Sequence, residues 1–358
     1  MQIKKSRSMF IILFIIILIV TGLTACGTES SLTPSDKNSE NLSATGDQYN
    51  KDALGAYELT IAGGSPGGFF SVMTEGYANI VRSAMPDTQI SVEPGDIATG
   101  IMKLMNGEVE VAWAQITEAS AAYSGKEPFP EPLEVRVMFT AWVDNPFQFI
   151  IEKSFAERYG IESLADIART KPPIRMGVNV KGILTEALFS DIITELGFTY
   201  EDVQNWGGSI FHTNAKGATE EMQNGKLDFF AMPVFAPSSD ILTLAQQREL
   251  KIIGIGDENV MNKVAEDWKL DKTILKQGTY DFVDKDVETY AISGMALVRH
   301  DASEDMVYDL TKTFFENLEA YRGLHQALNG LTEDKAANSS IPFHPGAEKY
   351  LKEVGLIE

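Results

Sequence analysis

Short apolar runs that alternate with amphipathic helical runs occupy the chain from residue 57 onward. Residues 57–62, 88–93 and 109–114 have the length and apolar content of strands, and 69–84 and 97–106 have helical spacing. Further strands are expected at 135–141, 147–151, 174–178, 227–231, 251–254 and 289–298, and further helices at 183–196, 216–224, 303–321 and 345–354. This alternation favours α/β layers with largely parallel sheets. We predict two lobes, formed by 57–140 with a C-terminal return over 254–358, and by 141–253.

The composition is that of a folded and acidic protein. Apolar residues make up 44% and charged residues 23%, which is ordinary for a globular chain. The net charge of −21 argues against nucleic acid as a partner, because that partner requires clustered Lys and Arg. The single Cys and four scattered His provide no thiolate metal site. We therefore predict no metal and no cofactor.

The N-terminus has the pattern of an export signal. Three basic residues, Lys4, Lys5 and Arg7, precede an apolar run over 9–20 that is short for a membrane span. The following Leu-Thr-Ala-Cys resembles a bacterial lipobox, so we predict a signal peptide over 1–25 and lipidation of Cys26. The polar residues of 26–56 are predicted to form a disordered tether. The protein would then be extracytoplasmic and anchored to the outer face of the cell membrane; an uncleaved anchor helix is the alternative.

Candidate binding residues follow from the rule that ligands of doubly wound sheets lie beyond the carboxyl ends of the strands. In the glycine-rich loop after the first strand, backbone N–H groups at a helix start could hold a carboxylate without Lys or Arg. The same loop could be only a tight turn. The candidates here are Gly64, Ser65, Gly67, Gly68 and Phe69.

This loop also matches the nucleophile elbow G-x-S-x-G of hydrolases. That interpretation fails because Pro66, directly after the serine, has no N–H for an oxyanion. The sequence offers no credible pair of nucleophile and base elsewhere, so we predict binding without catalysis.

The other candidates lie at later junctions between strands and helices or at the crossover between lobes. They are Asp96, Thr99, Gln115, Trp142, Asn179, Lys181, Thr185, Pro233, Phe235 and Ser238. Asp96 also has the position of a helix N-cap. Gln115 could instead be a solvated loop residue, as exposed lysines such as Lys181 usually are, and Trp142 and Phe235 could instead be core residues.

Several segments resemble a known family in order and spacing. They are the strand, loop and helix over 59–81, N-G-E-V-E-V-A-W-A-Q over 106–115, G-K-L-D-F-F over 225–230 and I-P-F-H-P-G-A-E-K-Y over 341–350. The resemblance is to TAXI-type solute receptors of tripartite ATP-independent periplasmic (TRAP) transporters, over about 57–356. It implies a type II periplasmic-binding-protein fold, no catalysis, and delivery of organic acids or acidic amino acids to a sodium-coupled permease.

The chain departs from the family pattern at the expected ligand contacts. Phe69 and Phe70 stand where the family has tyrosines, and Asp96 and Thr99 replace a serine and an asparagine. We predict a receptor that closes two lobes around a small solute, with an anion favoured, and passes it to a TRAP permease. A sensing or interaction lipoprotein with the same fold is the alternative.

Overall fold

The computed structural model describes residues 54–64 and 69–358. The predicted signal peptide, Cys26 and most of the predicted tether lie outside the described residues. Within the described part of the chain, no helix has both the length and the apolar character needed to cross a membrane.

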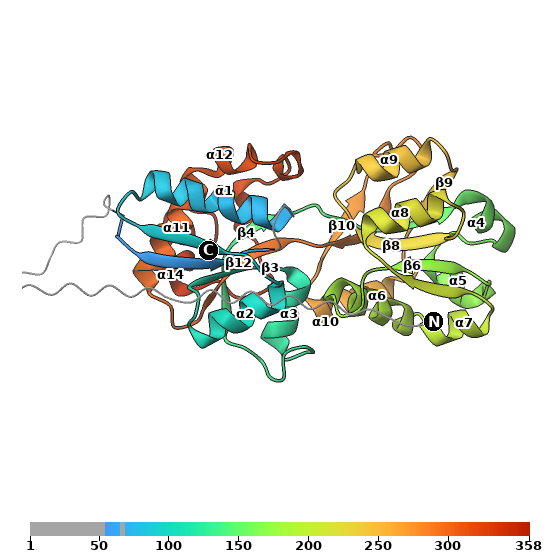
Figure 1. Ribbon diagram of the computed structural model, residues 1–358, viewed down its shortest axis with the longest axis horizontal. Helices are drawn as coiled ribbons and strands as arrows, with labels where there is room; N and C mark the ends of the chain where they lie inside the picture. The colour runs from blue at the N-terminus through green and yellow to red at the C-terminus, as the bar shows by residue number, and fades with distance from the viewer. Residues whose placement is uncertain (1–53, 65–68) are drawn as a thin grey trace, which may run out of the picture. The chain divides into compact units, whose positions relative to one another are not determined.

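The first lobe is built on a five-stranded mixed sheet in the order β2-β1-β3-β12-β4 (Figure 1). Its strands are β1 (Glu58–Ala62), β2 (Gln89–Glu93), β3 (Val111–Gln115), β4 (Val135–Trp142) and β12 (Gly294–Arg299). Strand β1 pairs in parallel with β2 and β3, whereas β12 runs antiparallel to β3 and β4. A strand from the C-terminal part of the chain therefore completes a sheet that the N-terminal part begins.

Helices cover both faces of this sheet because successive strand side chains point to opposite sides. On β3, Val111 and Trp113 join the apolar cluster of α1 (Phe69–Ala84) and α11 (Glu304–Glu316). The intervening Ala112 and Ala114 join the cluster of α2 (Ile97–Asn106) and α3 (Ile116–Ser124). The remaining elements of this lobe are α12 (Leu318–Arg322), η1 (Gln326–Leu328), α13 (Glu333–Ala336) and α14 (Pro345–Glu353).

The second lobe repeats the plan with a mixed sheet in the order β7-β6-β8-β5-β9. Its strands are β5 (Phe147–Glu152), β6 (Arg175–Val178), β7 (Ser209–His212), β8 (Phe229–Pro233) and β9 (Leu250–Ile253). Its helices are α4 (Lys153–Tyr159), α5 (Leu164–Thr170), α6 (Leu184–Glu195), α7 (Tyr200–Asn205), α8 (Ala215–Gln223) and α9 (Ser239–Ala245). The lobe boundaries 57–140 with 254–358 and 141–253 remain a proposal; β4 of the first sheet runs past residue 140 to Trp142.

Helix α10 (Glu258–Trp268) lies in the return segment and contacts both lobes. The indole Nε1 of Trp268 donates to Asp191 Oδ2 on α6 at 2.9 Å. Lys126, just after α3, donates from Nζ to the carbonyl of Asp267 at 2.8 Å. The antiparallel pair β10 (Asp271–Leu275) and β11 (Val287–Ala291) then leads the chain back to β12.

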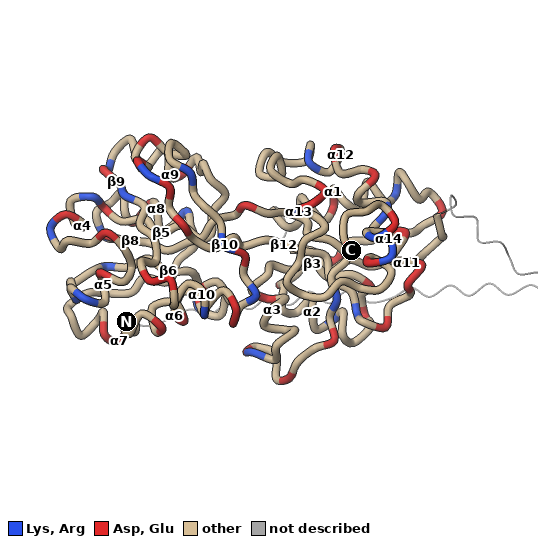
Figure 2. Tube along the Cα trace, turned by 180° about the vertical axis from the view of Figure 1, so that it is seen from behind, with Lys and Arg blue, Asp and Glu red and all other residues tan. Residues whose placement is uncertain are grey.

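Charged residues are distributed over both lobes. In the view of Figure 2, Lys and Arg are interspersed with Asp and Glu and do not gather on one face. Many of them form local surface pairs, such as Lys276 with Asp286 and Lys352 with Glu348.

Two of the predicted elements are wrong in extent. The strand expected over 289–298 is two strands, because the chain turns at Ile292 and Ser293. There, Ile292 N donates to Asn145 O, and Ser293 O accepts from Ile116 N. The helix expected over 303–321 ends at Glu316, where Asn317 donates its side-chain Nδ2 to Thr313 O and starts a separate short helix. At both breaks, polar groups form hydrogen bonds that do not belong to the regular pattern of the strand or the helix.

Replacement of Asp228 by alanine is expected to lower the free energy of unfolding by about 2 kcal/mol. Asp228 is 4% exposed, and its Oδ2 accepts from Arg175 N at 2.9 Å and from Arg175 Nε at 2.8 Å. The half-exposed Arg175 can reach water in the variant, which keeps the loss below that of a fully buried pair. Urea unfolding measures the change.

The control is Asp301→Ala, which breaks an exposed pair with Arg299 and should lower the free energy of unfolding by under about 0.5 kcal/mol. Equal losses for the two variants would contradict the prediction.

Candidate functional site

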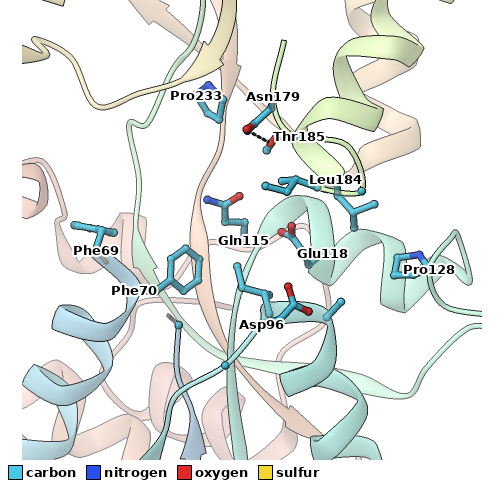
Figure 3. A pocket seen from close by; sticks show the side chains of 16 residues that line it. Phe69, Phe70, Asp96, Gln115, Glu118, Pro128, Asn179, Leu184, Thr185 and Pro233 are labelled. Carbon is cyan, nitrogen blue, oxygen red and sulfur yellow. Dashed lines mark hydrogen bonds between the residues drawn. The ribbon is translucent and has the colours of Figure 1, made fainter. Parts of the chain in front are cut away.

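A cavity of about 400 Å³ is lined by residues of both lobes (Figure 3). The first lobe contributes Gly64, Phe69, Phe70, Gly95, Asp96, Ile97, Ala98, Gln115, Glu118 and Pro128. The second lobe contributes Asn179, Gly182, Ile183, Leu184, Thr185 and Pro233. Most of these residues follow the carboxyl ends of strands β1, β2, β3, β6 and β8. The volume suits a small organic molecule.

Helices α2 and α3 begin at the cavity, and their N-cap residues, Asp96 and Gln115, present polar side chains to it. Asp96 is the N-cap of α2, where its Oδ1 accepts from Thr99 N at 3.0 Å and from Thr99 Oγ1 at 3.2 Å. Gln115 has the N-cap position of α3 but makes no capping hydrogen bond with its side chain. Its amide points toward the cavity in Figure 3 and is available to a guest.

The second-lobe wall is a turn held by its own hydrogen bonds. Asn179 donates from Nδ2 to Thr185 Oγ1 at 2.7 Å and accepts from Val180 N at 2.9 Å. Gly182 has a φ of 87°, which favours glycine. The turn therefore holds Asn179 and Thr185 together beside the cavity before any solute binds.

An aromatic wall closes one side of the cavity. Trp142 makes edge contacts with Phe69 and Phe70, with ring centroids at 5.3 Å and 4.7 Å. Glycines permit this packing: a Cβ on Gly64 would lie 2.3 Å from Cβ of Phe70, and one on Gly294 would lie 1.9 Å from the ring of Trp142. Trp142 thus supports the two phenylalanines that face the cavity.

Glu118 gives the cavity its most unusual electrostatic feature. This carboxylate is 5% exposed and accepts a hydrogen bond from the Thr117 hydroxyl at 2.7 Å. Burial raises the pKa of Glu118 to about 7, and the nearby negative charge of Asp96 contributes in the same direction. Among the described residues that line the cavity there is no Lys, Arg or His. The lining therefore carries two carboxyl groups and no balancing cation.

The structure brings seven of the predicted residues together around this cavity. They are Gly64, Phe69, Asp96, Gln115, Asn179, Thr185 and Pro233. Gly64 of the first lobe and Gly182 of the second lobe line the same space. Ser65, Gly67 and Gly68 lie outside the described residues. The role of every one of these residues in binding stays a prediction.

Five other predicted residues are not among the residues that line the cavity. Thr99 turns its hydroxyl to Asp96, and Trp142 is buried behind the phenylalanines. Phe235 packs on Phe69, with the two ring centroids 4.9 Å apart. Ser238 precedes α9 and donates its backbone N–H to Tyr280 Oη at 3.0 Å. Lys181 is exposed and lines a separate hollow with Glu186, Tyr200 and His212. No predicted cation therefore faces a guest in this cavity.

Sequence reasoning missed Glu118, Phe70 and Pro128 as lining residues. Glu118 lies three residues after Gln115, so it shares a helix face with the start of α3, and this spacing was a usable signal. Pro128 follows α3 in a loop and carried no signal. Across the described part of the chain, no three His, Cys, Asp or Glu side chains form a group that could hold a metal ion.

A sequence model of the NMT1-like family matches residues 61–355. The chain belongs to the NMT1-like family. The predicted fold class is confirmed: two α/β lobes of the type II periplasmic-binding-protein kind. The expectation of largely parallel sheets was wrong, because β12 and β5 each enter their sheet antiparallel to both neighbours. The matched range includes every described residue that lines the cavity.

Solved structures that are similar to this chain include three of low sequence identity. The periplasmic aliphatic sulphonate binding protein SsuA from Escherichia coli is 12% identical, with 82% of this chain and 78% of that chain covered and a TM-score of 0.42. PhnD1 from Prochlorococcus marinus, in complex with methylphosphonate, is 9% identical, with 84% and 99% covered and a TM-score of 0.49. Iron-bound HitA from Pseudomonas aeruginosa is 14% identical, with 84% and 99% covered and a TM-score of 0.44. Similarity at this level assigns no ligand to this chain.

Proposed function

We propose that this NMT1-like protein is an extracytoplasmic solute-binding receptor that captures one small molecule between its lobes and delivers it to a membrane permease. The observation that carries the proposal is the cavity, to which both lobes contribute the ends of their strands. A guest in contact with both walls favours the arrangement in which the lobes approach each other, and this difference would signal occupancy to the permease. The function is binding and delivery, without catalysis.

The finer assignment rests on the sequence. The motifs that resemble TAXI-type receptors support a TRAP permease as the partner. The lipobox-like residues support a lipid anchor at Cys26 and a location on the outer face of the cell membrane. The sequence favoured an anionic solute, but the described lining residues include no cationic side chain that could pair with an anion. The proposed function therefore does not specify the charge of the solute.

Solute released from the purified protein tests the proposal. The full chain, expressed in its membrane-anchored or secreted form, is denatured, and the released small molecules are identified by mass spectrometry. Adding one of them back in excess to solute-free protein is expected to raise its stability by about 2.7 kcal/mol at 100 times the dissociation constant, seen as a higher melting temperature. A chain that releases no solute, and whose melting temperature no metabolite library raises, would disprove the receptor role.

A matched pair of variants ties the solute to this cavity. Gly64→Val fills the space beside Phe70 and should abolish the shift in melting temperature caused by the released solute. Gly160→Asn, at a surface position with a φ of 63° and open space around it, should leave the shift unchanged. If both variants bind alike, the solute occupies another site.

A further inference from the structure

The charges that face the cavity are all of one sign. Asp96 and Glu118 both line it, and the described lining residues include no basic side chain. Asp96 is exposed and lies at the start of α2, whereas Glu118 is almost fully buried at the start of α3. A guest in this space meets two carboxyl groups from neighbouring helices of the first lobe, as Figure 3 shows.

The buried Glu118 is the informative member of the pair. A carboxylate withdrawn from water is costly unless a cation or several hydrogen bonds compensate it. The described residues contain no ion pair to Glu118, and the hydroxyl of Thr117 is its only hydrogen-bonding side chain. A purely structural role at this place would be served by an amide or an apolar residue. Hydrogen bonds from the Thr117 hydroxyl and from the backbone of Glu118 itself favour the ionised form, but no charged group of the described chain does. The carboxyl group therefore suits a positively charged partner that comes from outside the chain.

The other walls suit an organic cation better than a metal ion. Phe69 and Phe70 present aromatic rings to the same cavity, and a ring face attracts a cation within about 6 Å. The amides of Gln115 and Asn179 can bond to neutral polar groups of the guest. No third His, Cys, Asp or Glu joins Asp96 and Glu118 in a metal-binding group among the described residues, which makes an inorganic cation a poorer fit.

We infer that the solute of this receptor is a small organic cation, such as a protonated amine, whose charged group binds between Asp96 and Glu118 against the phenylalanine wall. This inference rests on the proposed function and names the class of solute that the receptor takes. It replaces the anion that the glycine-rich turns suggested. An anion here would meet two carboxyl groups in a space of low polarity, and this like-charge contact is unfavourable.

Three four-carbon probes that differ in charge test the inference: 1,4-diaminobutane, 1,4-butanediol and succinate. Calorimetric titration of the solute-free full chain at low salt and slightly alkaline pH is expected to show the diamine bound at least about 10-fold more tightly than either of the others. The molecules released from the purified protein provide the second measurement, and their charge is expected to be positive.

Conservative variants connect the diamine, or the released cation if it binds more tightly, to the two carboxyl groups. Glu118→Gln preserves the size of the side chain, and Asp96→Asn preserves a good N-cap. Each is expected to weaken binding about 30-fold or more. Glu319→Gln, an exposed first-turn residue of α12, is the matched control and should bind as the wild type does. Calorimetry in two buffers should also detect proton release when the cation binds, and Glu118→Gln should lose it.

The outcomes separate this inference from the proposed function. If the released solute is anionic or uncharged, or if succinate binds more tightly than the diamine, the inference of a cationic solute is wrong. The proposed receptor function is not affected by that result. Cation binding that neither Asp96→Asn nor Glu118→Gln weakens would also overturn it. A chain that releases nothing, binds none of the three probes and is stabilised by no member of the metabolite library would disprove both the receptor function and the cationic solute.

Discussion

Replacement of Trp142 by alanine is expected to lower the free energy of unfolding by about 4 kcal/mol and to abolish solute capture. Trp142 is 1% exposed, stacks on Trp113 with ring centroids at 6.1 Å, and makes edge contacts with both cavity phenylalanines. Its removal would leave a large void directly behind Phe69 and Phe70. These rings would lose their support, and the wall of the cavity would collapse into the void. Chemical denaturation and a thermal shift with the released solute measure the two effects.

Two further variants separate stability from binding. Trp142→Phe retains much of the apolar volume and removes an indole Nε1 that has no hydrogen-bond partner in the described structure, so its cost should stay under about 2 kcal/mol. Trp206→Ala removes a half-buried tryptophan that contacts Phe198 in the second lobe, away from the cavity. It should destabilise the protein and leave capture intact. Normal solute binding by a folded Trp142→Ala protein would show that the aromatic wall is not part of the site.

The sequence predicted the elements whose local signals agree with their packing. Helix α2 has the predicted bounds because Asp96 caps its start and Gly107, with a φ of 73°, ends it, while its apolar face meets β3. By contrast, helix α10 was not predicted, although local signals were present. Asp257 caps its start, and its buried residues Met261, Val264 and Trp268 have helical spacing.

Local sequence signals likewise predicted only part of the candidate site. Turns at strand ends could be located from glycine and capping residues, and this located Gly64, Asp96 and Asn179. Which face of each turn meets the other lobe depends on how the lobes are packed. The neighbours Lys181 and Gly182 illustrate the limit, because Gly182 lines the cavity and Lys181 does not. The sequence could not reveal the sign of the charge in the cavity for this reason.

The stability of the solute-free protein is expected to fall as the pH rises from about 4.5 to about 7, and Glu118→Gln is expected to lack this loss. The pKa of Glu118 is about 7 in the folded chain, whereas an unperturbed glutamate has a pKa of 4.5. Below pH 4.5 the group is protonated in both states and costs nothing. Between the two values the unfolded chain releases the proton first, so rising pH favours unfolding by about 3 kcal/mol in all.

Urea unfolding at about pH 4 and about pH 8 measures this difference for the wild type and for Glu118→Gln. Relative to the wild type, the variant should gain about 3 kcal/mol between the two conditions, whereas the exposed Glu319→Gln should gain nothing. Asp96→Asn should reduce the loss in part, because the charge of Asp96 raises the pKa of Glu118. A bound organic cation should stabilise the ionised carboxylate and shrink the pH dependence of the wild type. Parallel curves for the wild type and Glu118→Gln would show that Glu118 is already compensated in the folded chain, and the reason for a cationic guest would then be lost.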